Sequence, residues 1–369
     1  MIVTESFLPS INGVTGSVLR VLEHLRRQNH TALVVAPEGG PSAHEGTPVV
    51  RVPAVSIPGV SELPVGLPTR RLQEVMAGFR PDVVHLASPF VLGAGGLAAA
   101  RRLGVPTVAV YQTDLARFVR AYGAGVTART AWRWLCRLHR QADRTLAPSA
   151  AAADALVTSG VERVYRWGRG VDAAQFAPAR RDPALRRRLT PGGELLVGYI
   201  GRLAPEKHVE RLAALAHLDD VRLVVVGDGP ARPRLEWLLP DAAFLGMLTG
   251  DELAAAYATL DVFVHTGPFE TFGQAVQEAM ASGVPVVAPD AGGPRELVEH
   301  GRTGYLVPPG APDPLRAAVT HLRDDAVLRH SFGRAGRQAV RGRTWPVVCD
   351  ELMLHYAAVA AQPSVPKVA

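Results

Sequence analysis

Residues 194–210, ELLVGYIGRLAPEKHVE, show in one stretch the pattern that recurs along the whole chain. The run LLVGYIG is apolar on both faces, as expected of a strand in a parallel sheet that is covered by helices. Gly201 ends this strand, Arg202 stands at its carboxyl end, and Pro205 precedes a helix that we expect to start near Glu206. The stretch therefore predicts a buried strand, a short turn and a helix.

Strand-like runs of this kind alternate with helical patterns in both halves of the chain. The first half contains TALVVAP, PVVRVP, PDVVHLAS, VPTVAVYQ and DRTLAPS, and the second contains ELLVGYIGR, VRLVVVGDG, AAFLG, DVFVHTG, VPVVAPD and TGYLVPP. Because crossovers between parallel strands are right-handed, two doubly wound, Rossmann-like α/β sheets are the natural arrangement. Ligands of such sheets bind beyond the carboxyl ends of the strands, so we expect the substrate in a cleft between two facing domains.

The boundary between the two halves is marked by composition. The stretch GVDAAQFAPARRDPALRRRLTPGG is rich in Pro, Gly and Arg and has no strand pattern. We therefore predict an N-terminal domain at 1–169, a linker at 170–189, a C-terminal domain at 190–345, a final helix at 346–361 and a frayed tail at 362–369.

Composition limits the classes of function. The 369 residues are 47% hydrophobic and carry a formal net charge of +6, which suits an anionic substrate, an anionic membrane surface or nucleic acid. Aromatic residues make up only 6% and form no array with basic residues, which disfavours nucleic acid. We expect no signal peptide and no membrane span, because no suitable apolar run occurs. Two distant cysteines, Cys136 and Cys349, indicate a reducing cytosol rather than a disulfide framework.

Common metal and dinucleotide motifs are missing. The chain has no Asp-x-Asp and no His-Glu-x-x-His, so we expect no metal site and no cofactor. VVVGDGP contains Gly227 and Gly229, but the third position of a dinucleotide fingerprint is occupied by Arg232. We therefore predict no NAD site.

Lys207 stands out because, of the 40 Lys and Arg residues, only Lys207 and Lys367 are lysines. Lys207 and Arg202 flank one strand–helix turn, and a helix N-terminus there would add a positive dipole end. Together these groups suit a diphosphate, which Arg can grip bidentately and Lys can meet as a compact charge. The alternative is that Lys207 pairs with Glu206 or Glu210 on a solvated face, and spacing alone leaves both interpretations open.

Two glutamates, Glu270 and Glu278, are separated by seven residues in FETFGQAVQEAM. Glu270 lies just before a helix expected to begin around Gly273, where the amides of Phe272 and Gly273 are unpaired donors. Carboxylates accept hydrogen bonds from sugar hydroxyls, so Glu270 with these amides is suited to one sugar and Glu278 to another, such as a ribose. Glu278 could instead be a helix-surface residue, although its apolar neighbours indicate a partly packed face.

The spacing Glu-x7-Glu, together with GRLAPEK, VVVGDGP and ASGVPVVAPDAGGPREL, resembles the retaining glycosyltransferases of the GT-B fold, family 4. The resemblance runs from TESFLPSINGVTGSVLRVLEHL to WPVVCDEL, which is nearly the whole chain. Within the family, the chain is most similar to actinobacterial GDP-mannose-dependent α-mannosyltransferases that act on glycolipid acceptors. A related branch uses UDP-sulfoquinovose to build a sulfolipid.

The resemblance implies roles for the residues of the C-terminal domain. Arg202 and Lys207 would hold the donor diphosphate, and Glu278 would bind the nucleotide ribose. Glu270, with the amides of Phe272 and Gly273, would hold the donor sugar. The base is expected against the loop that follows AAFLG, from Met247 to Leu253.

The resemblance also implies roles in the N-terminal domain. Gly13 lies in a β–α turn that follows a short strand, and it would point at the diphosphate. VYQTDLARF contributes Gln112 and Asp114 to the catalytic residues; many relatives have His where this chain has Gln112. A neutral amide keeps a hydrogen bond to the donor sugar but cannot titrate. The final helix would cross back to the N-terminal domain.

Five arginines spaced by 4, 4, 3 and 4 residues predict one basic stripe on a helix: Arg129, Arg133, Arg137, Arg140 and Arg144. One interpretation is docking to anionic lipid. The other is a solvated face in an Arg-rich protein.

We therefore expect a retaining, metal-independent transferase that moves mannose from GDP-mannose to a lipid-linked or glycoside acceptor. It would work in the cytoplasm, with peripheral contact at the inner face of the membrane. The alternatives are a UDP-sugar-dependent enzyme, a nucleotide-sugar epimerase on the same fold, and a catalytically silent partner subunit suggested only by Gln112.

Overall fold

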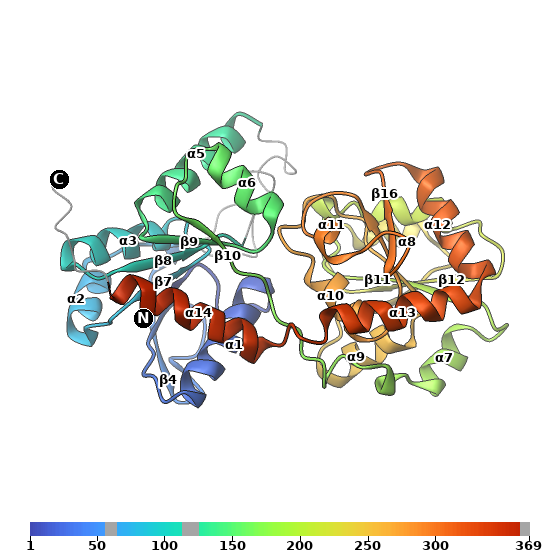
Figure 1. Cartoon of the computed structure of the whole chain (residues 1–369), viewed down its shortest axis with the longest axis horizontal. Helices are drawn as coiled ribbons and strands as arrows, with labels where there is room; N and C mark the ends of the chain where they lie inside the picture. The colour runs from blue at the N-terminus through green and yellow to red at the C-terminus, as the bar shows by residue number, and fades with distance from the viewer. Residues whose placement is uncertain (56–64, 113–124, 362–369) are drawn as a thin grey trace. The chain divides into compact units, whose positions relative to one another are not determined.

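The computed structural model describes residues 1–55, 65–112 and 125–361, and their contacts divide into two units (Figure 1). The first unit holds the described residues from Met1 to Arg169 and those from Pro346 onward. The second unit is Gly170–Trp345. Segment 170–189, expected as a linker, groups with the second unit and contains the short helices η1 (Pro178–Arg180) and α7 (Pro183–Leu189).

The sheet of the first unit has the strand order β10-β9-β8-β7-β1-β2-β4-β3, and all neighbours are parallel except the pair β3–β4. Its strands are β1 (Ile2–Thr4), β2 (Val34–Pro37), β3 (Ala43–His44), β4 (Thr47–Val52), β7 (Val84–Ala87), β8 (Thr107–Val110), β9 (Arg144–Ala147) and β10 (Val164–Arg166). Two further strands, β5 (Ala54–Val55) and β6 (Val65–Gly66), form a separate antiparallel pair. The helices are α1 (Gly13–Arg27), α2 (Arg70–Phe79), α3 (Leu92–Leu103), α5 (Gly125–Gln141), α6 (Ala150–Thr158) and α14 (Trp345–Ala360).

The second unit has a fully parallel sheet in the order β13-β12-β11-β14-β15-β16. Its strands are β11 (Leu195–Ile200), β12 (Val221–Val226), β13 (Ala243–Gly246), β14 (Val262–Val264), β15 (Val286–Pro289) and β16 (Gly304–Val307). Its remaining helices are η2 (Pro205–Lys207), η3 (Val209–Leu215), α8 (Arg232–Leu238), α9 (Gly250–Thr259), α10 (Gln274–Ala281), α11 (Pro294–Leu297), α12 (Pro312–Asp324) and α13 (Ala326–Val340).

Strand β11 shows why the sequence forms this sheet. Leu196 and Ile200 belong to one hydrophobic cluster, whereas Val197 and Tyr199 belong to another. Because successive side chains of a strand point to opposite faces, β11 contributes to a core on each side of the sheet. This double burial is what its continuous apolar run predicts.

The α/β prediction is confirmed, because each unit is built around a parallel sheet and each of the eleven predicted runs contains a strand. The prediction missed β3, β5, β6 and β10, which have only two or three residues and so carry little periodicity. The helix predicted near Glu206 is not an α-helix: the segment forms two short 3-10 helices, η2 and η3. His208 separates them in a left-handed conformation, with φ of 52°, which interrupts regular helix.

The last helix, α14, packs on the first unit (Figure 1). The buried indole Nε1 of Trp167 donates to the carbonyl oxygen of Val348 at 2.8 Å. Arg144 Nη1 lies 2.9 Å from His355 Nδ1. These contacts join the end of the chain to segments roughly two hundred residues earlier, so α14 completes the first unit rather than extending the second.

Candidate active site

Lys207 and Glu270 form an ion pair at the carboxyl edge of the second unit's sheet. Lys207 follows β11 and Glu270 follows β14, and these two strands are neighbours. Lys207 Nζ contacts Glu270 Oε1, with 26% and 19% of the two side chains exposed. The two residues that the sequence singled out separately therefore lie together, in a half-buried position that a ligand can reach.

The charge of Glu270 is stabilised by its surroundings. Burial by itself would raise the pKa of this carboxyl group, but the Lys207 ammonium and His265 outweigh burial and hold the pKa below its ordinary value. Glu270 is therefore a carboxylate at neutral pH, which makes it an acceptor of hydrogen bonds and not a proton donor.

Arg202 is held by Glu206 in the same turn. Arg202 Nη2 contacts Glu206 Oε1, and only 11% of the Glu206 side chain is exposed. Because η2 has just three residues, it offers much less of a helix dipole than the α-helix that we expected here. Positive charge at this turn therefore comes from the side chains of Arg202 and Lys207.

The loop that carries Glu270 is held in place by the glycines of the DAGGP segment. Gly293 N donates to the Glu270 carbonyl oxygen at 2.9 Å. A Cβ atom on Gly293 would overlap the backbone oxygen of Phe272. Glycine is needed here because two backbones meet without room for a side chain.

Helix α10 carries the remaining acid, Glu278, as its fifth residue, just over one turn from the loop. Its N-cap is Gly273, as predicted for the start of the helix, and Phe272 before it is buried. Glu278 accepts a hydrogen bond from Gln274 Nε2 at 3.2 Å and bonds the hydroxyl of Tyr257. Burial, and then the charge of Glu278, raise the pKa of that tyrosine well above its usual range. Glu278 is thus oriented by two polar partners.

The expected base-binding loop lies after β13. Met247 is 66% exposed, so it is accessible to a ligand. Leu253, on α9, packs against one of the hydrophobic clusters of the second unit instead. The two residues therefore differ in accessibility: the Met247 side chain is exposed, whereas the Leu253 side chain packs against the core.

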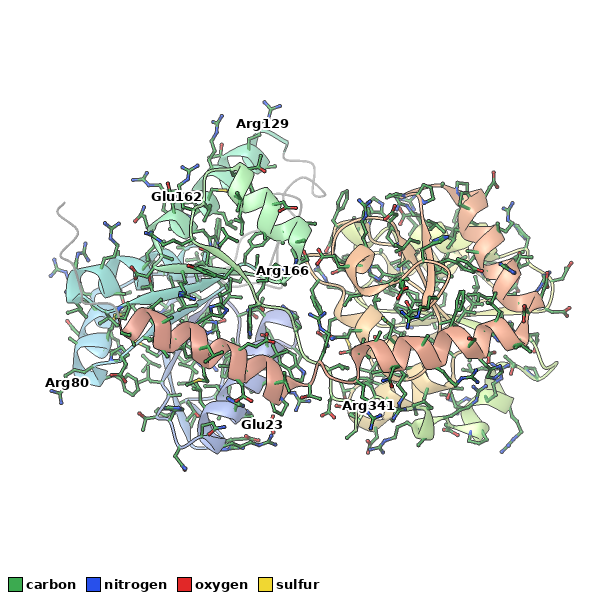
Figure 2. All side chains as sticks on the ribbon, viewed as in Figure 1. Glu23, Arg80, Arg129, Glu162, Arg166 and Arg341 are labelled. Carbon is green, nitrogen blue, oxygen red and sulfur yellow. The ribbon has the colours of Figure 1, made fainter. Side chains whose placement is uncertain are left out.

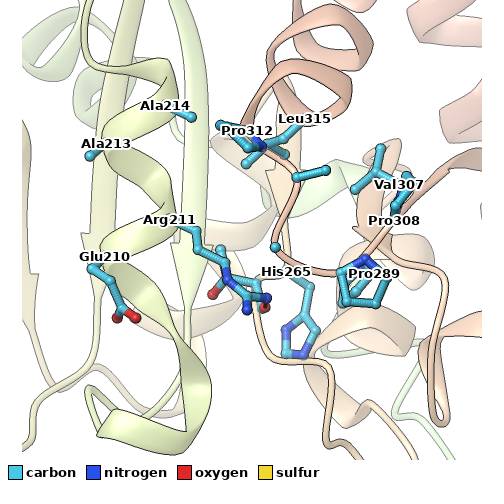
Figure 3. Close-up of a pocket in the computed structure, with 14 residues that line it drawn as sticks. Glu210, Arg211, Ala213, Ala214, His265, Pro289, Val307, Pro308, Pro312 and Leu315 are labelled. Carbon is cyan, nitrogen blue, oxygen red and sulfur yellow. Dashed lines mark hydrogen bonds between the residues drawn. The ribbon is translucent and has the colours of Figure 1, made fainter.

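Sequence reasoning missed His265, which follows β14. Its Nε2 lies 3.5 Å from Glu270 Oε1, and the residue is 4% exposed. The ring stacks against Tyr199 and Phe263. His265 and Arg211 also line a pocket of about 270 Å³ whose walls are mostly proline and aliphatic side chains (Figure 3). A lone histidine after a strand carries no signal in the sequence, because its contact with Glu270, five residues later, depends on how the loop between them folds back.

In the first unit, the structure brings Gly13 and Gln112 together through a third residue, Arg169. Arg169 Nη2 donates to Gln112 Oε1 at 2.7 Å, and both side chains are buried. A Cβ atom on Gly13 would lie 2.9 Å from Arg169 Nη1. Asp114, the other predicted catalytic residue of this segment, lies outside the described residues.

The predicted basic stripe is shorter than expected. Arg129, Arg133, Arg137 and Arg140 are exposed residues of α5, and Figure 2 shows Arg129 extending away from the ribbon. Arg144 is not on this helix, because α5 ends at Gln141 and Arg144 begins β9. Its guanidinium lies over the ring of Tyr165, 4.2 Å from the centroid.

Among the residues that the structure describes, no three His, Cys, Asp or Glu side chains gather in a way that could hold a metal ion. None of the helices in the same residues combines the length and apolar character needed to cross a membrane.

Comparisons with known proteins agree with the geometry. The model of Glycosyltransferase Family 4 matches residues 11–175, and that of Glycosyl transferases group 1 matches residues 181–339. The chain is 58% identical to the GDP-mannose-dependent alpha-mannosyltransferase of Mycolicibacterium smegmatis, over 98% of both proteins. It is 34% identical to the sulfoquinovosyl transferase SQD2 of Arabidopsis thaliana, over 91% of this chain and 68% of that protein.

A solved structure shows the same fold at low sequence identity. HepE of Anabaena, in complex with UDP, matches with a TM-score of 0.80 and 21% identity, over 97% of this chain and 99% of that one. The family suggested by the motifs is therefore confirmed: the chain belongs to glycosyltransferase family 4 and is a glycosyltransferase of the GT-B fold.

Proposed function

We propose that this enzyme transfers mannose from GDP-mannose, with retention of configuration, to a hydroxyl group of a lipid-linked or glycoside acceptor. The observation that carries the proposal is the 58% identity, over almost the full length, to an enzyme named for this donor. The lower identity of 34% to the sulfoquinovosyl transferase makes that donor the weaker alternative.

The charges at the carboxyl edge of the second unit support this chemistry. The bond between the mannose C1 and the β-phosphate oxygen breaks, and C1 forms a bond to the acceptor oxygen on the same face. The hydroxyl proton passes to the departing GDP. Arg202 and Lys207 would stabilise the negative charge that develops on the diphosphate. Glu278 would bind the ribose.

Glu270 would orient the mannose. Its lowered pKa keeps it ionised, so it can accept hydrogen bonds from two sugar hydroxyls, and the Phe272 and Gly273 amides lie next to it. In the first unit, Gln112 and Asp114 would contact the sugar, and Gly13 would lie near the diphosphate. A sulfonated sugar would place a second anion near Glu270, which disfavours the sulfoquinovose donor.

The donor can be tested directly with the purified protein. A ligand that binds only the folded state raises the melting temperature, so we expect GDP to stabilise more than UDP at equal concentration. Incubation with GDP-mannose and a glycolipid acceptor should give an α-mannoside by NMR. Larger stabilisation by UDP, with transfer from a UDP-sugar, would refute the donor assignment. Conversion of the donor sugar without acceptor would indicate an epimerase, and nucleotide binding without any turnover would indicate a silent subunit.

A lipid-linked acceptor suits peripheral contact with the anionic inner face of the cytoplasmic membrane. The exposed arginines of α5 support this proposal, together with Trp134, which is 38% exposed on the same helix. We expect binding to vesicles that contain phosphatidylglycerol, weakened by salt and by the double change R133E/R137E. If that variant binds the vesicles as well as the wild type does, the arginine stripe is a solvated face and not a membrane-binding surface.

A further inference from the structure

Arg169 is a buried cation that sequence motifs did not single out. It is 8% exposed, and its partner Gln112 is 7% exposed. The surrounding backbone is well anchored, because Trp167 N donates to Ala147 O at 2.9 Å and the Trp167 indole donates to Val348 in α14. The segment that carries Arg169 is therefore fixed to the end of β9 and to α14.

The hydrogen bond between Arg169 and Gln112 determines the polarity of the amide. A guanidinium has only donors, so the amide group that faces Arg169 must be the carbonyl oxygen. The Arg169 Nη2–Gln112 Oε1 distance of 2.7 Å is that of a strong hydrogen bond to a charged donor. Gln112 therefore presents its NH2 group, a donor of hydrogen bonds, on the side away from Arg169.

Arg169 also explains glycine at position 13. Gly13 is the first residue of α1, where alanine would suit the helix. A Cβ atom there would lie 2.9 Å from Arg169 Nη1, so the end of the Arg169 side chain would have to shift to admit it. The amides of Val14 and Thr15 are already bound by the Asn12 side chain, at 3.0 and 3.1 Å. The missing side chain at position 13 thus makes room for a guanidinium.

We propose that Arg169 is a positioning residue for the transfer reaction: it orients the Gln112 amide so that NH2 faces the donor sugar, and its guanidinium occupies the space that a side chain at position 13 would enter. This inference rests on the proposed function, in which Gln112 contacts the donor sugar. Arg169 acts through Gln112, so it should affect the turnover of the bound donor more than the binding of the nucleotide.

A double-mutant cycle tests the coupling. We expect Arg169→Ala to lower kcat at least about tenfold, while the rise in melting temperature with GDP stays near that of the wild type. Adding Gln112→Ala to this variant should lower kcat less than about twofold further, because the two residues act as a unit. Arg169→Lys keeps a charged hydrogen-bond donor, so its kcat should fall less than that of Arg169→Ala. Arg166→Ala, at an exposed position three residues earlier, is the matched control (Figure 2).

A second cycle separates two explanations for Gly13. Gly13→Ala should lower the kcat of the wild-type enzyme. It should not lower the kcat of Arg169→Ala any further, because removing the guanidinium makes room for the methyl group. If glycine instead served the approach of a phosphate, the loss would persist in both backgrounds.

The outcomes distinguish this inference from the proposed function. A wild-type kcat in Arg169→Ala would overturn the role of Arg169 but not the proposed function. The same holds if the fold-loss of kcat in the double variant equals the product of the two single losses, because the residues would then act independently. A wild-type protein that does not use GDP-mannose would overturn the proposed function itself. If Arg169→Ala does not fold, the cycle is run with Arg169→Lys. The fold-loss of kcat caused by Arg169→Lys must then be smaller in the Gln112→Ala background than in the wild type.

Discussion

Lys207 and Glu270 lie 63 positions apart in the chain, and their ion pair joins the ends of two neighbouring strands. Only one other lysine occurs, Lys367, although arginine is abundant. A compact ammonium on a flexible stem can contact both a carboxylate and a phosphate, whereas a planar guanidinium would tend to grip Glu270 bidentately. The geometry thus gives a physical reason for lysine at this position.

We expect Lys207→Ala and Arg202→Ala each to lower kcat at least about tenfold, which corresponds to about 1.4 kcal/mol of activation free energy. Lys207→Arg should also be impaired, because charge alone does not reproduce the contact geometry. Steady-state kinetics with GDP-mannose measure the effect, and Lys367→Ala serves as the control. Wild-type turnover in Lys207→Ala would remove this residue from the mechanism.

Glu270 should make stability depend on pH. Burial raises the pKa of its carboxyl group, but Lys207 and His265 lower that pKa by more, so it lies below the ordinary value of 4.5. A carboxyl group whose pKa is lowered by folding stabilises the protein above its unfolded-state pKa, and this contribution is lost as pH falls through the folded-state pKa. We therefore expect the free energy of unfolding to fall more steeply below about pH 5 in the wild type than in Glu270→Gln.

Denaturant titrations between about pH 3 and pH 7 measure this difference, with fluorescence and circular dichroism as independent probes. Parallel pH profiles for the two proteins would show that Glu270 is not stabilised as a carboxylate. The comparison needs no substrate, so it is independent of the donor assignment.

At the scale of elements, the loop between β14 and α10 depends on the loop after β15. The backbones at Gly293 and Phe272 touch, and Gly293 N holds the Glu270 carbonyl group. The Glu-x7-Glu motif and the Gly-Gly pair that follows it are therefore one structural unit. Glu270 and Glu278 are positioned by the second segment as well as by their own helix.

We expect Gly293→Ala to destabilise the protein by about 1–3 kcal/mol, because the added methyl group overlaps backbone atoms. It should also lower kcat/KM, since Glu270 moves with the loop. Gly342→Ala is the matched control: a Cβ atom there meets nothing within 4 Å, so its stability should change by less than about 0.5 kcal/mol. Equal melting temperatures for the two variants would contradict the close approach at Gly293.

At the scale of the whole molecule, the chain leaves the first unit after Arg169 and returns to it at Pro346. Val171 N donates to Arg343 O at 2.8 Å, so the entering and leaving segments run together at the start of the second unit. Each unit has its own sheet and its own hydrophobic clusters. Contact order is high in both, because parallel strands pair over long sequence separations.

In the proposed function, Arg202 and Lys207 would stabilise the charge of the diphosphate, so no bound metal would be needed for it. We therefore expect mannosyl transfer to survive excess EDTA, measured with the wild-type enzyme and a glycolipid acceptor. A metal-dependent transferase assayed in the same buffer provides the control. Loss of activity that Mg²⁺ or Mn²⁺ restores would show that a metal takes part.

The sequence by itself determined the two parallel sheets, because continuous apolar runs and helical spacings are local properties of the chain. It also indicated Lys207 and Glu270 as candidate site residues. Lys207 is one of only two lysines in an arginine-rich chain, and Glu270 belongs to the Glu-x7-Glu motif. Only the tertiary structure decided which residues meet: Arg169 with Gln112, His265 with Glu270, and Arg144 with Tyr165. The physical reason is that the geometry of these contacts follows from strand order, loop folding and packing rather than from any local sequence pattern.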